Sequence, residues 1–544
     1  MCRLHRAAHA GSTAGWTEQE DGEEAALPIR HPDDVNRSMN SVRKALVYTA
    51  ADRYFGLAVN FGVTVVVSRL LTPSEIGISV TGSAIAGLAL SLREFSSTAF
   101  IVQRPNLSRE DVRAAFTIML ALTSLISAVL FLCAPLIAHA YGEEGLVSYL
   151  RLISAAILIE VAAAPVLALM RREMAFGQAA LVNIVSAASG ACAVITLAAL
   201  GFSYMSFALA WLISAVCGGI LTFSLRRQFW ILKLLFRNWK AVVAFGFYNG
   251  LIAMLSRMYD RVPYLVLGSF LSFDAAGLFN RTLTVAQLPD KMFLANSVAV
   301  VLSRFSSEAR DGGNLKTNYL TALAYVTVVH WPALCVLAIL ARPIVVFLYG
   351  EQWLEIVPLV RIAAIAALCS FSFGLNYCVL MAVGAVREAF LRAVIVCPVS
   401  ALVLLAAAPF GLRGMALSLL LTVPFQAAVS LLFVRHHISM TWGELTLSLW
   451  KSAAVTIGTA VGPASVALAC YPSDIGLATA VLAAALSCLG WSFTIWLVGH
   501  PVVREVGHVA QFIRGTLQTR QHPDPAIPSI VDGGRIAIPP GEAR

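Results

Sequence analysis

The dominant feature of this sequence is a series of apolar runs, many of about 20 residues, separated by short polar segments. Runs of this length can cross the hydrocarbon core of a bilayer as helices. The composition agrees, with 58% hydrophobic and 13% charged residues and a mean hydropathy of +0.78 over 544 residues. We therefore predict an all-α polytopic membrane protein with about fourteen transmembrane helices.

The predicted spans can be oriented from the charges of the loops between them. In chain order, the spans cover 43–69, 76–99, 112–134, 149–170, 178–200, 203–224, 241–267, 274–302, 317–341, 356–381, 388–409, 413–434, 448–470 and 475–498. With the N-terminus inside, the cytoplasmic loops hold most of the Lys and Arg residues. The positive-inside rule then predicts a bacterial inner-membrane protein with both termini in the cytoplasm. Because these loops explain the net charge of +9, we expect no nucleic-acid binding.

The two halves of the chain resemble each other at an offset of about 200 residues. The matched segments are 70–77 with 270–277, Arg104 and Asp111 with Arg304 and Asp311, 141–143 with 349–351, and 172–176 with 387–390. Six spans per repeat is an even number, so both repeats point the same way. We predict two six-helix lobes related by a parallel repeat, with the site between them and two C-terminal helices outside it.

This repeat divides the chain into six segments. They are a disordered cytoplasmic N-terminal tail (1–41), an N-lobe (42–224), a basic amphipathic cytoplasmic linker (225–240), a C-lobe (241–436), spans 13 and 14 (437–499), and a mostly disordered cytoplasmic tail (500–544). Met39 begins a stretch that resembles a translation start. The ten cysteines are scattered without metal-binding spacing, so we treat them as small apolar residues.

Six basic residues lie inside the apolar runs, and they occur only in spans 1, 2, 7 and 8. They are Arg53, Arg93, Arg257, Arg261, Arg281 and Lys291. Each would cost roughly 2.5–3.5 kcal/mol at the centre of a lipid-facing helix. We therefore expect these side chains to face a shared wet interior that accepts an anion. Spans 1 and 2 open one repeat and spans 7 and 8 open the other, so these helices should meet.

Several neighbouring side chains complete a candidate substrate site. Arg257 and Arg261 are four residues apart and share a helix face. Guanidinium groups bind phosphate oxygens in a bidentate fork, and a lysine adds a point charge. Amides in the same spans can bind sugar hydroxyls, and the candidates are Asn60, Asn249 and Gln287.

Acidic residues in these spans have two alternative interpretations. The candidates are Asp52, Glu94, Glu160, Asp260 and Asp290. They either couple transport to H⁺ or Na⁺, or neutralise adjacent cations in the pairs Asp52–Arg53, Arg93–Glu94, Arg257–Asp260 and Asp290–Lys291. Glu160 stands alone in span 4, where a neutral carboxyl is a further alternative. No catalytic motif or metal-ligand cluster is present, so we predict no enzyme activity, metal or cofactor.

The segment Ser68-Arg69-Leu70-Leu71-Thr72-Pro73-Ser74-Glu75-Ile76-Gly77 resembles a signature of bacterial Wzx-like polysaccharide flippases. These proteins belong to the multidrug/oligosaccharidyl-lipid/polysaccharide superfamily. Further similar segments are 259–261, 276–281, 288–289 and Gly350-Glu351-Gln352-Trp353. The resemblance covers about residues 42–500 and favours the polysaccharide branch over the drug-antiporter branch.

The resemblance implies two six-helix lobes around a cavity lined by spans 1, 2, 7 and 8. It also implies alternating access and a polyprenyl-diphosphate oligosaccharide as cargo, for exopolysaccharide, capsule or O-antigen. In related lipid II flippases, spans 13 and 14 hold the lipid tail. Expected partners are membrane lipid and a polysaccharide polymerase with its co-polymerase. The alternatives are an ion-coupled small-molecule antiporter using Asp52, a membrane glycan polymerase, and a scaffold of a polysaccharide assembly complex.

Overall fold

The computed structural model describes residues 32–93, 99–104, 107–235, 239–294, 298–470 and 476–503. Every regular element in these ranges is helical, which confirms the predicted all-α membrane fold. Ten stretches of this part are long and apolar enough to cross a membrane. Two long helices at the predicted site, α1 (Pro32–Leu70) and α8 (Trp239–Phe270), are not among these ten. The expected number of fourteen therefore stays a prediction.

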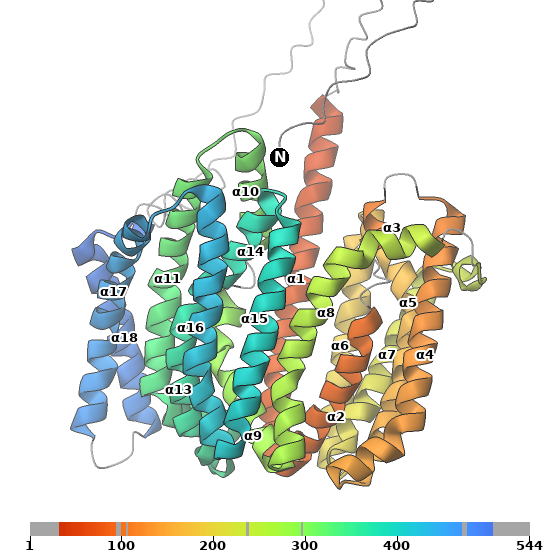
Figure 1. The fold of residues 1–544 in the computed structure, drawn as a ribbon, viewed down its shortest axis with the longest axis horizontal. Coiled ribbons are helices and arrows are strands. Elements are labelled where there is room, and N and C mark those ends of the chain that lie inside the picture. The colour runs from red at the N-terminus through yellow and green to blue at the C-terminus, as the bar shows by residue number, and fades with distance from the viewer. Residues whose placement is uncertain are drawn as a thin grey trace, which may run out of the picture.

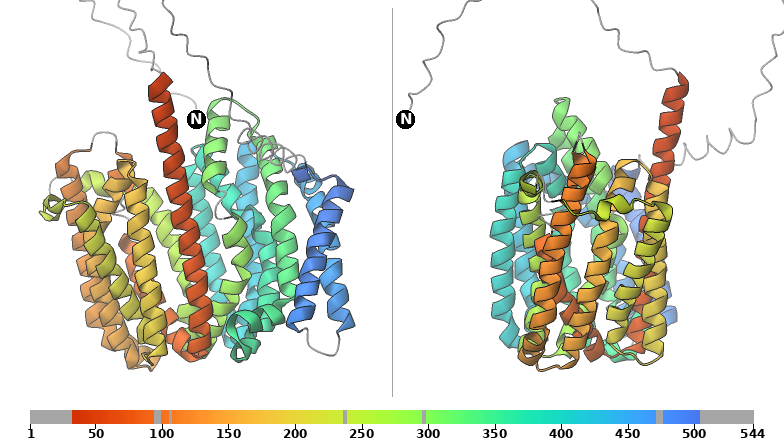
Figure 2. Two further views of the ribbon diagram at one scale, coloured as in Figure 1. Left: turned by 180° about the vertical axis from the view of Figure 1, so that it is seen from behind. Right: turned by 90° about the vertical axis from the view of Figure 1, so that its right-hand side faces the viewer.

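The first half of the chain runs from α1 to the short 3₁₀ turn η2. Its other helices are α2 (Pro73–Ser91), α3 (Ala99–Gln103), α4 (Arg109–Tyr141), α5 (Gly145–Arg172), α6 (Phe176–Ala199), α7 (Met205–Leu225) and η2 (Phe229–Leu232). Figure 1 shows these helices as one bundle, in red to yellow. α1 packs on α6 and projects beyond the bundle at its N-terminal end (Figure 2).

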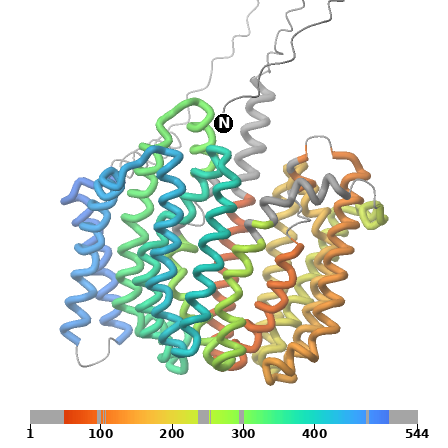
Figure 3. The backbone as a smooth tube through the Cα atoms, in the orientation of Figure 1, coloured from red at the N-terminus to blue at the C-terminus, as the bar shows by residue number. Residues whose placement is uncertain are grey.

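The second half begins with α8 and forms a second bundle. It continues with α9 (Phe273–Ala286), η3 (Asp290–Leu294), α10 (Val298–Arg310), α11 (Leu315–Ile339), α12 (Ala341–Tyr349), η4 (Glu351–Ile356), α13 (Val357–Ala367), η5 (Leu368–Ser372), α14 (Phe373–Ala382), α15 (Val386–Ala407), η6 (Ala408–Phe410), α16 (Gly411–Ile438), α17 (Trp442–Ala469) and α18 (Leu477–Val498). The hairpin of α17 and α18 packs mainly on α11 at the outer side of this bundle (Figure 3).

Equivalent caps start the second helix of each half. The Glu75 backbone N–H donates to Thr72 Oγ1 (3.4 Å), and the Thr72 N–H donates to the Glu75 carboxylate (2.7 Å). This capping box fixes the start of α2 at Pro73. At the matching position, the Ala275 N–H donates to Ser272 Oγ (3.1 Å) and starts α9. The signature in the sequence is therefore a helix-start signal.

Two predicted spans are not continuous helices. The expected span over 274–302 ends as α9 at Ala286 and continues as the π-turn η3. Pro289, which lacks an N–H group, stands in this break and explains why the regular helix stops. The expected span over 356–381 is divided by the 3₁₀ segment η5 into α13 and α14. In membrane proteins, broken helices commonly lie beside transport sites.

The basic segment after α7 is also not the amphipathic helix that we predicted, in the part that is described up to residue 235. Only η2 is helical there, over four residues. Ile231 is fully buried in the core of the first bundle, and the Arg109 guanidinium lies over the Trp230 ring at 5.5 Å. Arg113 Nε also donates to the Lys233 carbonyl (2.9 Å). Burial of Ile231 and the contacts made by Arg109 and Arg113 therefore hold this segment against the first bundle.

Helices α17 and α18 approach closely through glycines. An ideal Cβ on Gly458 would lie 2.1 Å from Thr494 Oγ1, and one on Gly490 would lie 2.7 Å from the Gly458 carbonyl oxygen. Small residues allow such close packing between membrane helices, where apolar burial alone gives little driving force. The spacing Gly458-x-x-x-Gly462 places both glycines on one face of α17.

We expect Gly490→Leu to separate α17 from α18 and to destabilise the protein by about 1–3 kcal/mol, because overpacking forces the backbones apart. The thermal unfolding midpoint of purified protein in detergent measures this loss. Gly219→Leu is the control, because no atom outside its own helix backbone and its chain neighbours lies within 4 Å of an ideal Cβ there. Equal loss in both variants would contradict the packing argument.

Candidate functional site

The two bundles touch backbone to backbone where α2 and α9 begin. An ideal Cβ on Gly77 would lie 1.7 Å from the Phe273 carbonyl oxygen, and one on Gly277 would lie 2.0 Å from the Pro73 carbonyl oxygen. Neither position has room for a side chain. Residues 73 and 77 are the repeat partners of 273 and 277, so the contact is reciprocal. We call the end of the bundle that contains it the distal end, opposite the first residue of α1 (Figure 1).

A reciprocal pair of clasps surrounds this crossing. At the end of α4, Tyr141 donates to the Leu265 carbonyl (3.4 Å) and its ring stacks with Phe273 at a centroid distance of 6.4 Å. On the other side, Gln352 Nε2 and Trp353 Nε1 both donate to the Ser68 carbonyl, at 2.6 and 2.8 Å. The two segments that carried much of the resemblance, 68–77 and 350–353, therefore bind each other.

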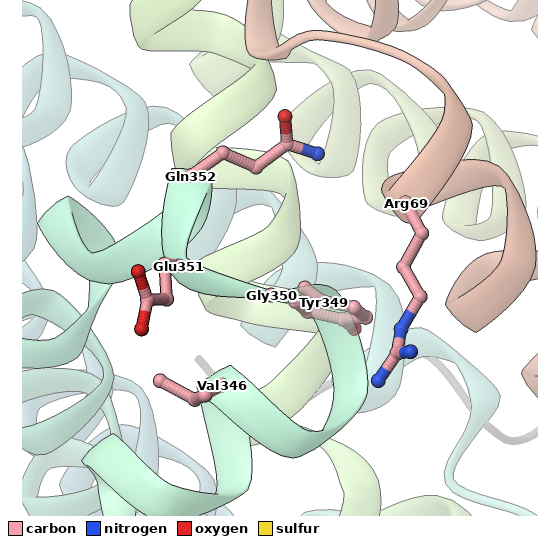
Figure 4. A pocket seen from close by; sticks show the side chains of 6 residues that line it. All are labelled: Arg69, Val346, Tyr349, Gly350, Glu351 and Gln352. Atoms are coloured by element: carbon pink, nitrogen blue, oxygen red, sulfur yellow. The ribbon is translucent and has the colours of Figure 1, made fainter.

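Arg69 adds a second contact to the latter clasp. Its Nη2 donates to the Phe347 carbonyl (2.5 Å) and its Nε donates to the Leu348 carbonyl (3.3 Å), near the C-terminal end of α12. A hollow of about 410 Å³ opens beside it. Figure 4 shows its lining residues, which are Arg69, Val346, Tyr349, Gly350, Glu351 and Gln352. The hollow includes none of the six predicted cations.

Arg281 lies directly beneath this closure and is nearly buried, at 6% exposure. Its guanidinium carbon is 5.8 Å from the Tyr349 ring centre and 5.9 Å from that of Trp353. Nη1 donates to Asn280 Oδ1 (3.2 Å), whereas Nε is buried without a hydrogen-bond partner. The aromatic faces therefore balance the charge of Arg281 in this conformation.

The two α8 arginines differ in their surroundings. Arg261 packs on α2, where an ideal Cβ on Gly87 would be 2.9 Å from its Nε. Arg257, one turn earlier, is exposed. The exposed Asp260 interacts electrostatically with both arginines. Of the four spans that we predicted to meet, three do so, because α2 packs against α8 and α9, whereas α1 packs mainly on α6.

Arg93 and Glu160 form an ion pair that the sequence analysis missed. Arg93 Nη2 lies 3.4 Å from Glu160 Oε1, and Trp211 Nε1 donates to Glu160 Oε2 (3.1 Å). Glu160 is therefore not isolated, because the turn after α2 and helix α7 both supply partners. Through these two contacts, Glu160 on α5 links the turn after α2 to α7. Glu94, the partner expected for Arg93, lies outside the described residues.

On α1, one alternative was that Asp52 and Arg53 neutralise each other, but Asp52 has a partner on another helix. Asp52 Oδ2 accepts from Asn183 Nδ2 of α6 (2.8 Å), whereas Arg53 is exposed. Adjacent residues on a helix point about 100° apart, which favours separate partners. Asn60 donates to the Gly56 carbonyl of its own helix (2.8 Å) and is also exposed. The side chain of Asn249 lies outside the described part.

At the break after α9, Asp290 contacts an element that the sequence analysis overlooked. Its Oδ1 hydrogen-bonds to His330 Nε2 of α11. Gln287 and Lys291 are exposed and four residues apart, on the face that also holds Thr284. A histidine inside an apolar run was the available sequence signal. Its partner was hidden because contacts between spans cannot be inferred from spacing along the chain.

Comparison with known proteins places this geometry in context. Residues 66–358 match the family model described as "Polysaccharide biosynthesis protein". The chain is 21% identical to the lipopolysaccharide biosynthesis protein WzxC of Escherichia coli K12 over 56% of its length and 62% of the relative. It is 24% identical to the succinoglycan biosynthesis transport protein ExoT of Rhizobium meliloti over 57% of its length and 63% of the relative. These matches span less than two thirds of either relative.

A solved structure shares the fold. The lipid II flippase MurJ, in an inward closed conformation, superposes with a TM-score of 0.64 at 13% sequence identity. The match covers 83% of this chain and 98% of MurJ. Most of the chain is therefore compatible with a known membrane architecture.

We expect Gly77→Ala to force the distal ends of the two bundles apart, because its Cβ would overlap the Phe273 carbonyl. The distance between spin labels at Leu200→Cys and Phe410→Cys, in a background without other cysteines, should increase. Both positions are exposed, at 68% and 78%. Gly62→Ala is the control, since no atom outside its own helix backbone and its chain neighbours lies within 4 Å of its ideal Cβ. An unchanged distance in Gly77→Ala would show that the crossing does not hold the distal end closed.

Proposed function

The chain belongs to the polysaccharide biosynthesis protein family, and from this premise we propose that it is a flippase for a lipid-linked oligosaccharide. The cargo is an undecaprenyl-diphosphate-linked repeat unit, moved across the bacterial inner membrane for exopolysaccharide, capsule or O-antigen synthesis. The observation that carries the proposal is the packing of Arg261 against α2 beside the exposed Arg257. Cationic groups thus stand where the two bundles meet.

A diphosphate suits these groups chemically. Two guanidinium groups one turn apart offer forked donors to phosphate oxygens. Lys291 and Gln287, exposed at the break after α9, extend the polar surface toward the sugars. Arg53 and Asn60 contribute from the exposed face of α1. Arg93 and Arg281 are already engaged by Glu160 and by aromatic rings, so they bind cargo only if the bundles rearrange.

We propose alternating access as the mechanism. The distal end, closed by the Gly77–Gly277 crossing and its clasps, would face the periplasm, and both termini would lie in the cytoplasm. Cargo would enter between α1, α2, α8 and α9 and leave after the clasps separate. Outward movement of negative charge gains about 2.3 kcal/mol per charge per 100 mV from an inside-negative potential.

The remaining segments have roles within this proposal. The segment 42–224 forms the N-lobe and 241–436 forms the C-lobe. The α17–α18 hairpin provides a groove for the polyprenyl tail, and its exposed apolar side chains, such as Leu468 at 78%, suit lipid contact. Asp52 and Asp260 balance charge or bind a coupling ion. A polysaccharide polymerase and its co-polymerase would receive the translocated unit.

The decisive test uses cells that lack this gene and produce either wild type or Arg257→Ala/Arg261→Ala. We expect the double variant to insert normally but to lose at least tenfold of polymer output, with the lipid-linked unit accumulating on the cytoplasmic leaflet. Loss of one charge-assisted hydrogen bond of about 1.5–3 kcal/mol is sufficient for a tenfold effect. Polymer yield and leaflet-resolved labelling of the lipid-linked unit measure both quantities.

Arg387→Ala is the matched control, because Arg387 is an exposed arginine in the first turn of α15 and is not one of the proposed cargo residues. It should leave both quantities unchanged. If the double variant delivers the unit normally but no polymer forms, the protein acts after translocation, as a polymerase or scaffold would. Normal polymer output in the double variant would exclude the α8 arginines as a cargo site.

A further inference from the structure

Asp290 and His330 form a buried contact that the proposed cargo site does not require. His330 has no exposed surface, and its Nε2 hydrogen-bonds to Asp290 Oδ1. Its other ring nitrogen, Nδ1, is also buried and has no hydrogen-bond partner. Asp290 is about a third exposed and opens the π-turn η3, so the pair joins the accessible break after α9 to the interior of α11. Such turns are frequent at functional sites.

Among the described residues, few charged groups lie near this pair. On the α9 side, exposed Lys291 interacts electrostatically with Asp290. On the α11 side, Thr327 hydrogen-bonds to Ser452 of α17 (2.9 Å), which lies 3.3 Å from His500 Nε2. Lys451 approaches the same end and donates to the Gly499 carbonyl. Within the described residues, the side chains of Asp290 and His330 form their hydrogen bond to each other and to no other side chain.

The pair changes its charge balance when one proton binds. With a neutral imidazole, the pair carries the single negative charge of Asp290, which Lys291 then partly balances. With an imidazolium, the pair is neutral, so the carboxylate no longer needs Lys291 as its counter-ion. A buried ion needs such a partner because desolvation is costly. Protonation of His330 therefore frees Lys291 to bind an external anion.

The same argument applies in reverse. An anion held at Lys291 adds negative charge beside Asp290 and removes its lysine partner, which favours the imidazolium form of His330. Two binding events linked in this way strengthen each other by the same factor. The sign is fixed: the proton and the anion bind together and leave together.

We propose that Asp290 and His330 form a proton-binding site whose occupation is linked to binding of a diphosphate at Lys291. This inference rests on the proposed function and identifies an ion whose binding is linked to binding of the cargo. The sequence leaves H⁺ and Na⁺ open as coupling ions. This proposal selects H⁺ and assigns Asp290 to the proton site.

Calorimetry of the full-length protein in lipid nanodiscs tests the linkage with farnesyl diphosphate as the probe. Titrations at pH 7 in two buffers of different ionisation enthalpy give the number of protons taken up per ligand bound. We expect wild type to take up more protons than His330→Gln, which keeps a donor for Asp290 but cannot titrate. Wild-type affinity should rise more steeply than that of the variant between pH 8 and pH 6, by up to about tenfold per pH unit for one linked proton.

Two further variants make the test specific. Asp290→Asn should lose the extra proton uptake, as His330→Gln does. His500→Gln should retain it, because His500 is equally a buried histidine, at 2% exposure, but contacts Ser452 and not Asp290. Protons taken up by the diphosphate itself are the same in every variant and cancel in the comparison.

The outcomes separate the two proposals. Equal proton uptake by wild type and His330→Gln, with binding intact in both, would overturn the proton site and leave the flippase proposal standing. Loss of the extra uptake in His500→Gln as well as in His330→Gln would also overturn it. If farnesyl diphosphate fails to bind wild type at any pH, diphosphate recognition and the linkage are both contradicted.

Discussion

The backbone contact between Gly77 and Gly277 is the constraint on which the arrangement of the two bundles depends. It brings the starts of α2 and α9 so close that neither glycine can carry a Cβ. Because the two residues are partners in the internal repeat, each bundle presents the same surface to the other. The clasps lie beside this crossing but use different residues, because Tyr141 donates to the Leu265 carbonyl and Trp353 donates to the Ser68 carbonyl. The backbone crossing is therefore the part of the closure that the repeat duplicates.

The same crossing explains how the cations are distributed along the two central helices. Close to the crossing, the rings of Tyr349 and Trp353 cover Arg281, so that aromatic faces take the place of water around its guanidinium group. Farther away, each central helix ends in a charged pair with its own bundle, Arg93 with Glu160 on one side and Asp290 with His330 on the other. Arg257 and Lys291 remain exposed between these two levels. The exposed Arg257 and Lys291 therefore differ from the buried Arg281, whereas Arg69 is an exposed cation at the distal contact itself.

Much of this fold could be predicted because membrane helices are encoded locally. Length, apolarity and loop charge indicate the helices, and repeated short motifs such as 70–77 and 270–277 indicate the symmetry. The breaks in α9 and at η5 were missed because a long apolar run gives the same signal whether or not its helix is continuous. Contacts such as Asp52–Asn183 and Glu160–Trp211 were missed for a different reason. Their partners are far apart in sequence, and the nearest opposite charge along the chain is a poor guide to them.

The two proposals meet at the break after α9. In the proposed alternating access the distal clasps open, and the glycine crossing is a contact between bundles that leaves no room for a side chain on either glycine. Opening there would change backbone contacts at the crossing. The pairs Arg93–Glu160 and Asp290–His330 each lie within one bundle and would move with it. Proton binding at His330 acts on the one pair that also adjoins an exposed cation, Lys291. The charge of the cargo site can therefore respond to a proton without any change in the contacts that hold the distal end closed.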